Sequence, residues 1–111
     1  MNKILVEVSV GELLDKISIL EIKSEKIKDP EKLKFIIDES KILNEQLNLN
    51  VTFNEEIKKL YKDLKKINLK LWNIEDEKRM CEKNLDFGKD FIRLSREVHF
   101  LNDKRSNIKL D

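Results

Sequence analysis

The strongest periodic pattern in the chain runs from Ile57 to Leu85 and reads IKKLYKDLKKINLKLWNIEDEKRMCEKNL. Its apolar positions alternate steps of three and four residues over four heptads, with one polar interruption. The positions are Ile57, Leu60, Leu64, Ile67, Leu71, Ile74, Lys78, Cys81 and Leu85. This spacing is typical of a helix whose apolar seam packs against neighbouring helices. Thr52 and Glu55 match a capping box, so we expect one long helix over residues 53–85.

Shorter helices are expected on both sides of this one. Ser9 and Glu12 form another capping box, and the apolar residues after it occupy two sides of a helix, which predicts a central position. Asp29-Pro30 ends that helix and starts the next, and Asp86-Phe-Gly88 separates the last two. The expected helices span 10–28, 30–47, 53–85 and 89–110, with a loop at 48–54.

The N-terminal residues follow a different pattern. Lys3 to Val8 is rich in β-branched residues and has no helical period, so 3–8 is predicted to be a short strand or an extended arm. A single strand needs a partner, and the rest of the chain offers none. It either packs as an arm or pairs with the same strand of a second copy. The fold class is therefore all-α, a bundle of about four helices in one domain, 1–111, with this strand or arm at its start.

Composition limits the classes of protein that fit. The chain has 111 residues, and 41% of them are charged. It contains no alanine, two glycines and one proline. Tight backbone packing, Gly-rich phosphate loops and turn-rich β architectures are not expected. The net charge of +1 argues against a main role in holding a polyanion. The single cysteine, Cys81, is typical of a cytoplasmic protein. We predict no signal peptide, because Glu7 interrupts the first apolar run, and no membrane span, because no apolar stretch reaches ~20 residues.

The segment Leu71 to Arg79 holds the densest group of candidate site residues. Trp72, Glu75, Asp76 and Arg79 share one face of the expected helix. One interpretation is a polar pocket in which Arg79 binds an anion. The other, which we favour, is a buried ion pair between Glu75 and Arg79 beside Trp72.

The expected last helix contains a second polar group. Ser95 and His99 lie side by side on one helix, which does not suit nucleophilic catalysis. We expect His99 to bond Asp103, and Arg105, at a seam position, to reach a carboxylate or extend to solvent. One His and one Cys do not provide a zinc or di-iron site, and no metal or cofactor is predicted. A magnesium site made by Glu21, Glu25, Glu75 and Asp76 is kept as an alternative.

Several motifs occur in an order that resembles a domain-of-unknown-function family of short bacterial and phage proteins. They are Ile4-Leu-Val-Glu-Val-Ser-Val-Gly-Glu-Leu-Leu-Asp-Lys-Ile17, Ile19 to Lys23, Leu71-Trp72 with Ile74-Glu75-Asp76 and Arg79, Asp86-Phe87-Gly88, and Asn102-Asp103 with Arg105 and Lys109. Residues 30–54 depart from the family pattern. The resemblance implies a helical architecture and marks out a polar set: Asp15, Lys16, Glu21, Lys23, Trp72, Glu75, Asp76, Arg79, Asn102, Asp103 and Arg105. All of these except Asp15 make up the predicted polar site.

Three functions are compatible with the sequence. The long seam, the unpaired strand and the lack of a catalytic signature favour a dimeric interaction or accessory module that is not an enzyme. The alternative is a helical bundle that binds or acts on a small anion, which requires Lys16, Lys23, Arg79 and Arg105 to converge on a cavity. Nucleic-acid binding comes last. It would use the basic flank Lys58, Lys59, Lys62, Lys65, Lys66 and Lys70, where Glu55, Glu56 and Asp63 are interspersed.

Overall fold

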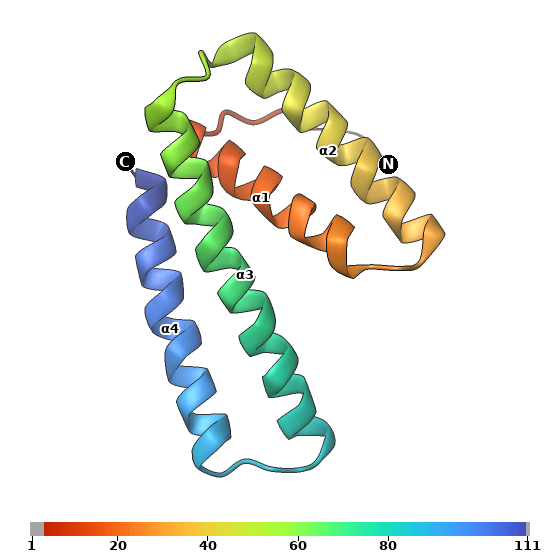
Figure 1. Ribbon diagram of the computed structural model, residues 1–111, viewed down its shortest axis with the longest axis vertical. Coiled ribbons are helices and arrows are strands. Elements are labelled where there is room, and N and C mark those ends of the chain that lie inside the picture. Colours follow the sequence, from red (N-terminus) through yellow and green to blue (C-terminus); the bar gives the residue numbers. More distant parts are fainter. Residues whose placement is uncertain (1–3, 111) are drawn as a thin grey trace.

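The computed structural model describes residues 4–110, and this part of the chain forms four helices (Figure 1). They are α1 (Val10–Lys26), α2 (Pro30–Asn50), α3 (Glu55–Lys83) and α4 (Lys89–Leu110). Of the described residues, 83% are helical, which confirms the predicted all-α bundle. None of these helices is long and apolar enough to span a bilayer, within the residues described.

The helices form two antiparallel hairpins that meet at an angle, and α1 lies where they meet (Figure 1). α1 packs against α2, α3 and α4, which confirms its predicted central position. Its apolar residues supply much of the core, in which Leu14 and Ile17 contact Leu47 of α2 and Leu64 of α3 in one cluster. The loop end of the α3–α4 hairpin projects away from α1 and α2.

Two of the three predicted N-cap residues are confirmed. The Ser9 hydroxyl accepts a hydrogen bond from the Glu12 amide at 3.1 Å, and the Asp29 carboxylate accepts one from the Glu31 amide at 3.0 Å. The predicted Thr52 cap is wrong. Asn54 caps α3 by accepting from the Ile57 amide at 2.9 Å, and Asn is the stronger N-cap residue.

The ends of α1, α2 and α3 differ from the predicted ends by two or three residues, and α4 ends at Leu110 as predicted. α2 continues to Asn50 because Leu47 is buried in the core and the Asn50 side chain donates to the Gln46 carbonyl, so the loop shrinks to 51–54. α1 stops at Lys26 since Ile27 is extended. α3 stops at Lys83, before Leu85, which has a positive φ of 54°.

Gly11 contradicts the expectation that backbones do not pack tightly. A Cβ atom on this residue would lie 2.2 Å from the backbone carbonyl oxygen of Lys109. α1 and α4 therefore approach each other so closely that only glycine fits at this crossing. Composition did not reveal the contact because one glycine is enough to permit it.

The N-terminal residues 4–9 adopt neither helix nor strand in the single chain, and residues 4–8 are exposed. Lys3, the first residue of the predicted strand, lies outside the described residues. Pairing of this segment with a second copy stays a prediction.

Candidate functional site

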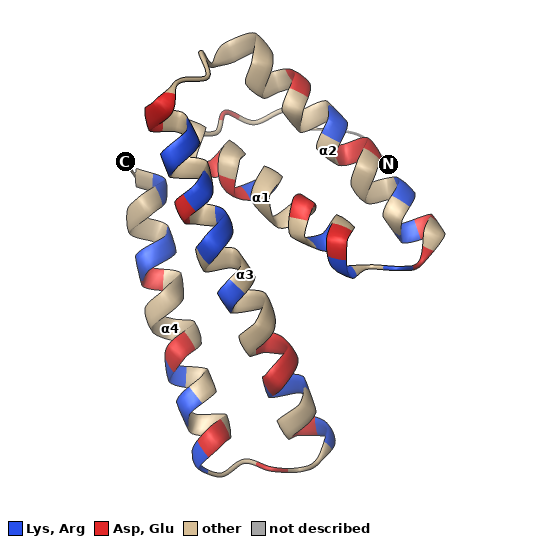
Figure 2. Ribbon diagram, in the orientation of Figure 1, with Lys and Arg blue, Asp and Glu red and all other residues tan. Residues whose placement is uncertain are grey.

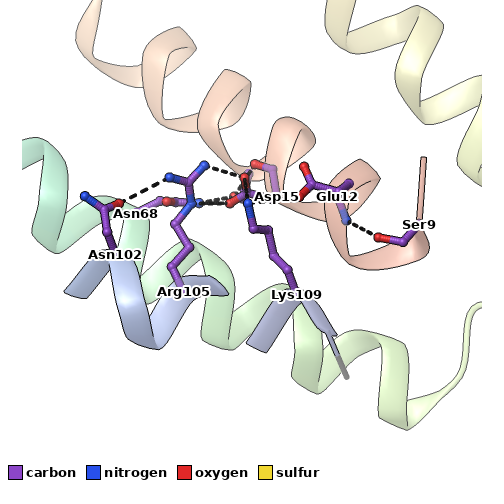
Figure 3. A network of polar contacts seen from close by, with 8 residues as sticks. Ser9, Glu12, Asp15, Asn68, Asn102, Arg105 and Lys109 are labelled. Atoms are coloured by element: carbon purple, nitrogen blue, oxygen red, sulfur yellow. Dashed lines mark hydrogen bonds and ion pairs between the residues drawn. The ribbon is translucent and has the colours of Figure 1, made fainter. Parts of the chain in front are cut away.

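The polar centre of the molecule is an ion pair between α1 and α4 (Figure 3). Arg105 donates from Nε to Asp15 Oδ1 at 2.9 Å and from Nη2 to Asp15 Oδ2 at 2.5 Å. The Asp15 side chain is only 3% exposed, and Lys109 approaches both Asp15 (3.8 Å) and Glu12 (3.0 Å). Of the two alternatives predicted for Arg105 at its seam position, a carboxylate or solvent, the structure shows the carboxylate.

Asn68 connects α3 to this pair. Its Nδ2 donates to Asp15 Oδ1 and to Ser18 Oγ, both at 2.8 Å. Ser18 in turn donates its hydroxyl proton to the Asp15 backbone carbonyl at 2.7 Å. A single carboxylate thus joins three helices. Sequence reasoning missed Asn68 and Ser18, and the only available signals were a polar residue next to the seam residue Ile67 and a serine one turn after Asp15.

The environment of Asp15 favours its charged form. Burial alone would raise the pKa of the carboxyl, but the hydrogen bonds from Arg105 and Asn68 and the charges of Arg105 and Lys109 outweigh it, so the pKa is lowered. The same hydrogen bond raises the pKa of Arg105. The pair is therefore ionised at neutral pH.

A groove of about 320 Å³ opens beside this network, between α1 and the α3–α4 hairpin. Its apolar wall comes from Ile19, Ile22, Leu71 and Trp72. Its polar lining is Asn68, Glu75, Arg79, Asn102 and Arg105. The groove is thus amphipathic, and the polar network borders one part of it.

Five of the ten predicted site residues line this groove: Trp72, Glu75, Arg79, Asn102 and Arg105. The other five lie outside its lining. Glu21 accepts from the Tyr61 hydroxyl and from Lys65 Nζ, the latter at 2.6 Å, and this hydrogen bond raises the pKa of Lys65. Lys16 is exposed, and Lys23 is half-buried. Asp76 pairs with Arg79, and Asp103 lies 3.7 Å from His99, which is ion-pair range and too long for the expected hydrogen bond.

The predicted buried pair between Glu75 and Arg79 is wrong. Arg79 instead bonds Asp76, one turn earlier on α3, and all three side chains are exposed. The reason is geometric. The seam residue Ile74 is buried, whereas Glu75, Asp76 and Arg79 occupy exposed positions of α3, from which α1 diverges at an angle (Figure 1).

Metal binding and the basic flank find little support. Within residues 4–110 no group of three or more His, Cys, Asp or Glu side chains gathers, so the four carboxylates of the magnesium alternative do not meet.

On α3, Lys58 pairs with Glu55, and Lys65 pairs with Glu21 and Glu25. Figure 2 shows acidic residues among the lysines along the first half of this helix.

The α3–α4 hairpin carries a second feature, a surface centred on α4 that exposes large apolar side chains among polar ones. Ile92, Arg96 and Phe100 follow one another at steps of four residues, and shallow hollows around Phe100 are also lined by Lys70 and Asn73 of α3. We call these five residues the hairpin face. Ile92 and Phe100 are more than half exposed. Towards the loop end, further exposed apolar residues follow: Met80, Leu85 and Phe87.

In comparisons with known proteins, no family model matches the chain, and neither a curated protein nor a solved structure shows significant similarity to it. The resemblance based on the sequence motifs stays a prediction.

Proposed function

We propose that the protein is a self-associating helical interaction module, in which the hairpin face of one copy packs against the same face of a second copy. The observation that carries the proposal is the amount of surface. The single chain exposes 8719 Å². A folded monomer of 13.3 kDa exposes about 6,500 Å². The radius of gyration, 16.0 Å, also exceeds the roughly 13 Å of a compact domain of this length.

The excess surface includes apolar side chains along the hairpin. Leu64 in the α3 seam is fully buried, whereas Leu85, just past the end of α3 at the loop end of the hairpin, is 76% exposed. Lys78, the polar interruption of the seam, places its Nζ 5.5 Å from the centre of the Phe91 ring. The hairpin beyond α1 is therefore a two-helix layer that lacks a covering layer in the single chain. Apolar surface left in water is unfavourable by about 25 cal/mol per Å², which favours association.

The charges around the hairpin face suit a second copy. Arg96 lies over the Phe100 ring at 5.9 Å, and Glu97, its neighbour, receives a hydrogen bond from Arg93 at 3.3 Å. Glu97 also borders both hollows of the face, beside the cationic Lys70 and Arg96. A two-fold symmetric contact places the same surface on both sides, so a face bordered by both signs of charge can complement itself. A uniformly charged face would repel its copy.

The size of the face is also close to what a dimer requires. α4 has 22 residues. At ~1.5 Å per residue it is ~33 Å long, and a face two helices wide offers roughly 650 Å² in projection. Standard interfaces bury about 800 Å² per partner, so the hairpin supplies most of the area that a stable dimer needs.

The competing functions receive less support. The small-anion alternative needs four cationic side chains around one cavity, but Lys16 and Lys23 do not line the groove, and Arg79 and Arg105 are each already paired with a carboxylate. Nucleic-acid binding would use the flank of α3, where Lys58 and Lys65 are paired with carboxylates and Glu55, Glu56 and Asp63 lie among the other lysines.

Sedimentation equilibrium of matched variants tests the proposal. Phe100 on the hairpin face is 58% exposed, and Phe35 on α2 is 77% exposed. We expect wild type and Phe35→Glu to sediment at twice the mass of one chain, and Phe100→Glu at the mass of one chain. Circular dichroism should show the same helix content for all three.

A variant that lacks residues 1–8 separates the two surfaces that have been considered. If the hairpin face carries the contact, the truncated chain stays dimeric. A dimer that is lost on truncation but withstands Phe100→Glu would assign the contact to the N-terminal segment. A wild-type chain that stays monomeric at high micromolar concentration would contradict self-association altogether.

A further inference from the structure

We infer that the groove between α1 and the α3–α4 hairpin is a binding site for a small neutral molecule with a flat apolar body and a primary carboxamide or lactam edge. The two observations behind this inference are a nearly buried acceptor without a donor and free N–H groups beside it. The inference concerns a surface other than the hairpin face and does not depend on self-association.

The acceptor is the side-chain carbonyl oxygen of Asn68. This residue is only 6% exposed and lines the groove. The Asp15 carboxylate can only accept hydrogen bonds, and the Ser18 hydroxyl donates its proton to the Asp15 backbone carbonyl. The atom of the Asn68 side chain that contacts both the carboxylate and the hydroxyl must therefore be the donor, Nδ2. This fixes the orientation of the amide, and Oδ1 points away from Asp15. No residue between 4 and 110 donates to this oxygen. In this part of the chain, every side-chain polar atom that is fully enclosed has a hydrogen-bond partner, so an oxygen without a partner is not fully enclosed. The oxygen therefore opens onto the groove.

The donors lie next to it. Asn68 and Arg105 both bond Asp15 Oδ1, at 2.8 and 2.9 Å, so their side chains are neighbours. The guanidinium has five N–H groups, of which two bond Asp15 and one bonds Asn102 Oδ1 at 3.4 Å. Asn102 uses its oxygen in this contact, and in Figure 3 its amide nitrogen lies on the side away from Arg105. Two guanidinium N–H groups and the Asn102 amide thus remain available.

An acceptor flanked by donors matches a particular ligand edge. A primary carboxamide or a lactam presents N–H and C=O side by side, so its N–H can donate to Asn68 while its oxygen accepts from Arg105 or Asn102. A carboxylate has no proton to give Asn68 at neutral pH. It would also gain little from Arg105, whose charge is already neutralised by Asp15.

The rest of the groove suits an apolar body. Ile19, Ile22, Leu71 and Trp72 form one wall, and the volume of about 320 Å³ falls at the small end of the range for ligand pockets. An aromatic ring can pack against this wall while its polar edge reaches Asn68. The charged Glu75 and Arg79 also line the groove and are exposed.

Trp72 is the only tryptophan of the chain, so its indole N–H gives one resonance that reports on the groove. We would follow it in ¹⁵N-labelled full-length protein during titration with benzamide, its cyclic counterpart isoindolin-1-one, the isosteric anion benzoate, and N,N-dimethylbenzamide. We expect saturable shifts with benzamide or isoindolin-1-one. Benzoate and the dimethyl amide, which lack the N–H, should bind about tenfold more weakly or not at all.

Benzamide and isoindolin-1-one distinguish a ligand with a primary carboxamide from a ligand with a lactam, because the probe that binds more tightly shows which polar edge the groove prefers. Ile19→Phe narrows the groove and should weaken binding about tenfold, whereas Ile37→Phe, the same change on an exposed side of α2, should leave it unchanged. The inference would be overturned if benzoate bound as tightly as the neutral probes or more tightly. It would also be overturned if neither neutral probe shifted the Trp72 resonance, or if Ile19→Phe and Ile37→Phe changed the affinity equally. None of these results depends on whether the chain is a dimer.

Discussion

Arg105 near the end of the chain donates two hydrogen bonds to the carboxylate of Asp15, ninety residues earlier. Because Asn68 donates to the same carboxylate, a single buried aspartate fixes the relative positions of α1, α3 and α4. Buried ion pairs add little net stability compared with apolar residues, but loss of one partner leaves the other charged and desolvated. The groove beside the pair has its shape because this contact holds the helices in place.

Arg105→Met is expected to lower the free energy of unfolding by about 3 kcal/mol, because it leaves Asp15 without its main partner. Arg79→Met, the control, removes an exposed pair with Asp76 and should cost less than about 1 kcal/mol. Urea denaturation followed by circular dichroism gives both values. Equal, small losses would show that the Asp15 pair is not structural.

The Asp15 pair also predicts a dependence of stability on pH. The pKa of Asp15 is lowered in the folded chain relative to its usual 3.8, so the unfolded chain takes up the proton at higher pH. The stabilisation is complete above the unfolded pKa and is lost as the pH falls through the folded value. We expect the urea midpoint of wild type to drop more steeply than that of Asp15→Asn between about pH 5 and about pH 2. Parallel curves would exclude this contribution.

Gly11→Ala should destabilise the fold by about 1–3 kcal/mol, because the new methyl group would meet the Lys109 carbonyl and force α1 and α4 apart. Gly88→Ala provides the control. A Cβ there would touch only the Asp86 side chain, at 3.4 Å, and its φ is not positive. Thermal unfolding of the two variants should differ clearly. A tolerated Gly11→Ala would mean that the helices do not cross so closely.

Leu85→Gly should stabilise the folded single chain by about 1 kcal/mol. Leu85 has a φ of 54° at the end of α3, where its amide bonds the Glu82 carbonyl and the Asp86 amide bonds the Cys81 carbonyl. This is a Schellman C-cap, in which glycine is the usual residue at this position. Urea denaturation at low protein concentration, where the chain is monomeric, measures the change. A loss of stability would show that the Leu85 side chain supports the hairpin.

The helices were predictable because each has a strong local signal. The seam of α3 and the caps at Ser9 and Asp29 depend only on residues close together in sequence. The polar site was half predictable. Trp72 and Arg79 do line a groove, but the choice of Asp76 over Glu75 as the partner of Arg79 depends on the rotamers of exposed side chains. The Asp15 contacts could not be derived from local patterns, since they join residues 53 and 90 positions apart.

The most direct test of the proposed self-association is photo-crosslinking from the hairpin face itself. Benzoylphenylalanine replaces Phe100 in one sample and, as the control, the exposed Phe35 of α2 in another. We predict that irradiation at position 100 yields a covalent species of twice the chain mass, with crosslinks that map to the α3–α4 hairpin of the second copy. Position 35 should yield only the single chain. The proposal would be contradicted if crosslinked dimers formed from position 35 but not from position 100, or if no crosslinked dimer formed from either position.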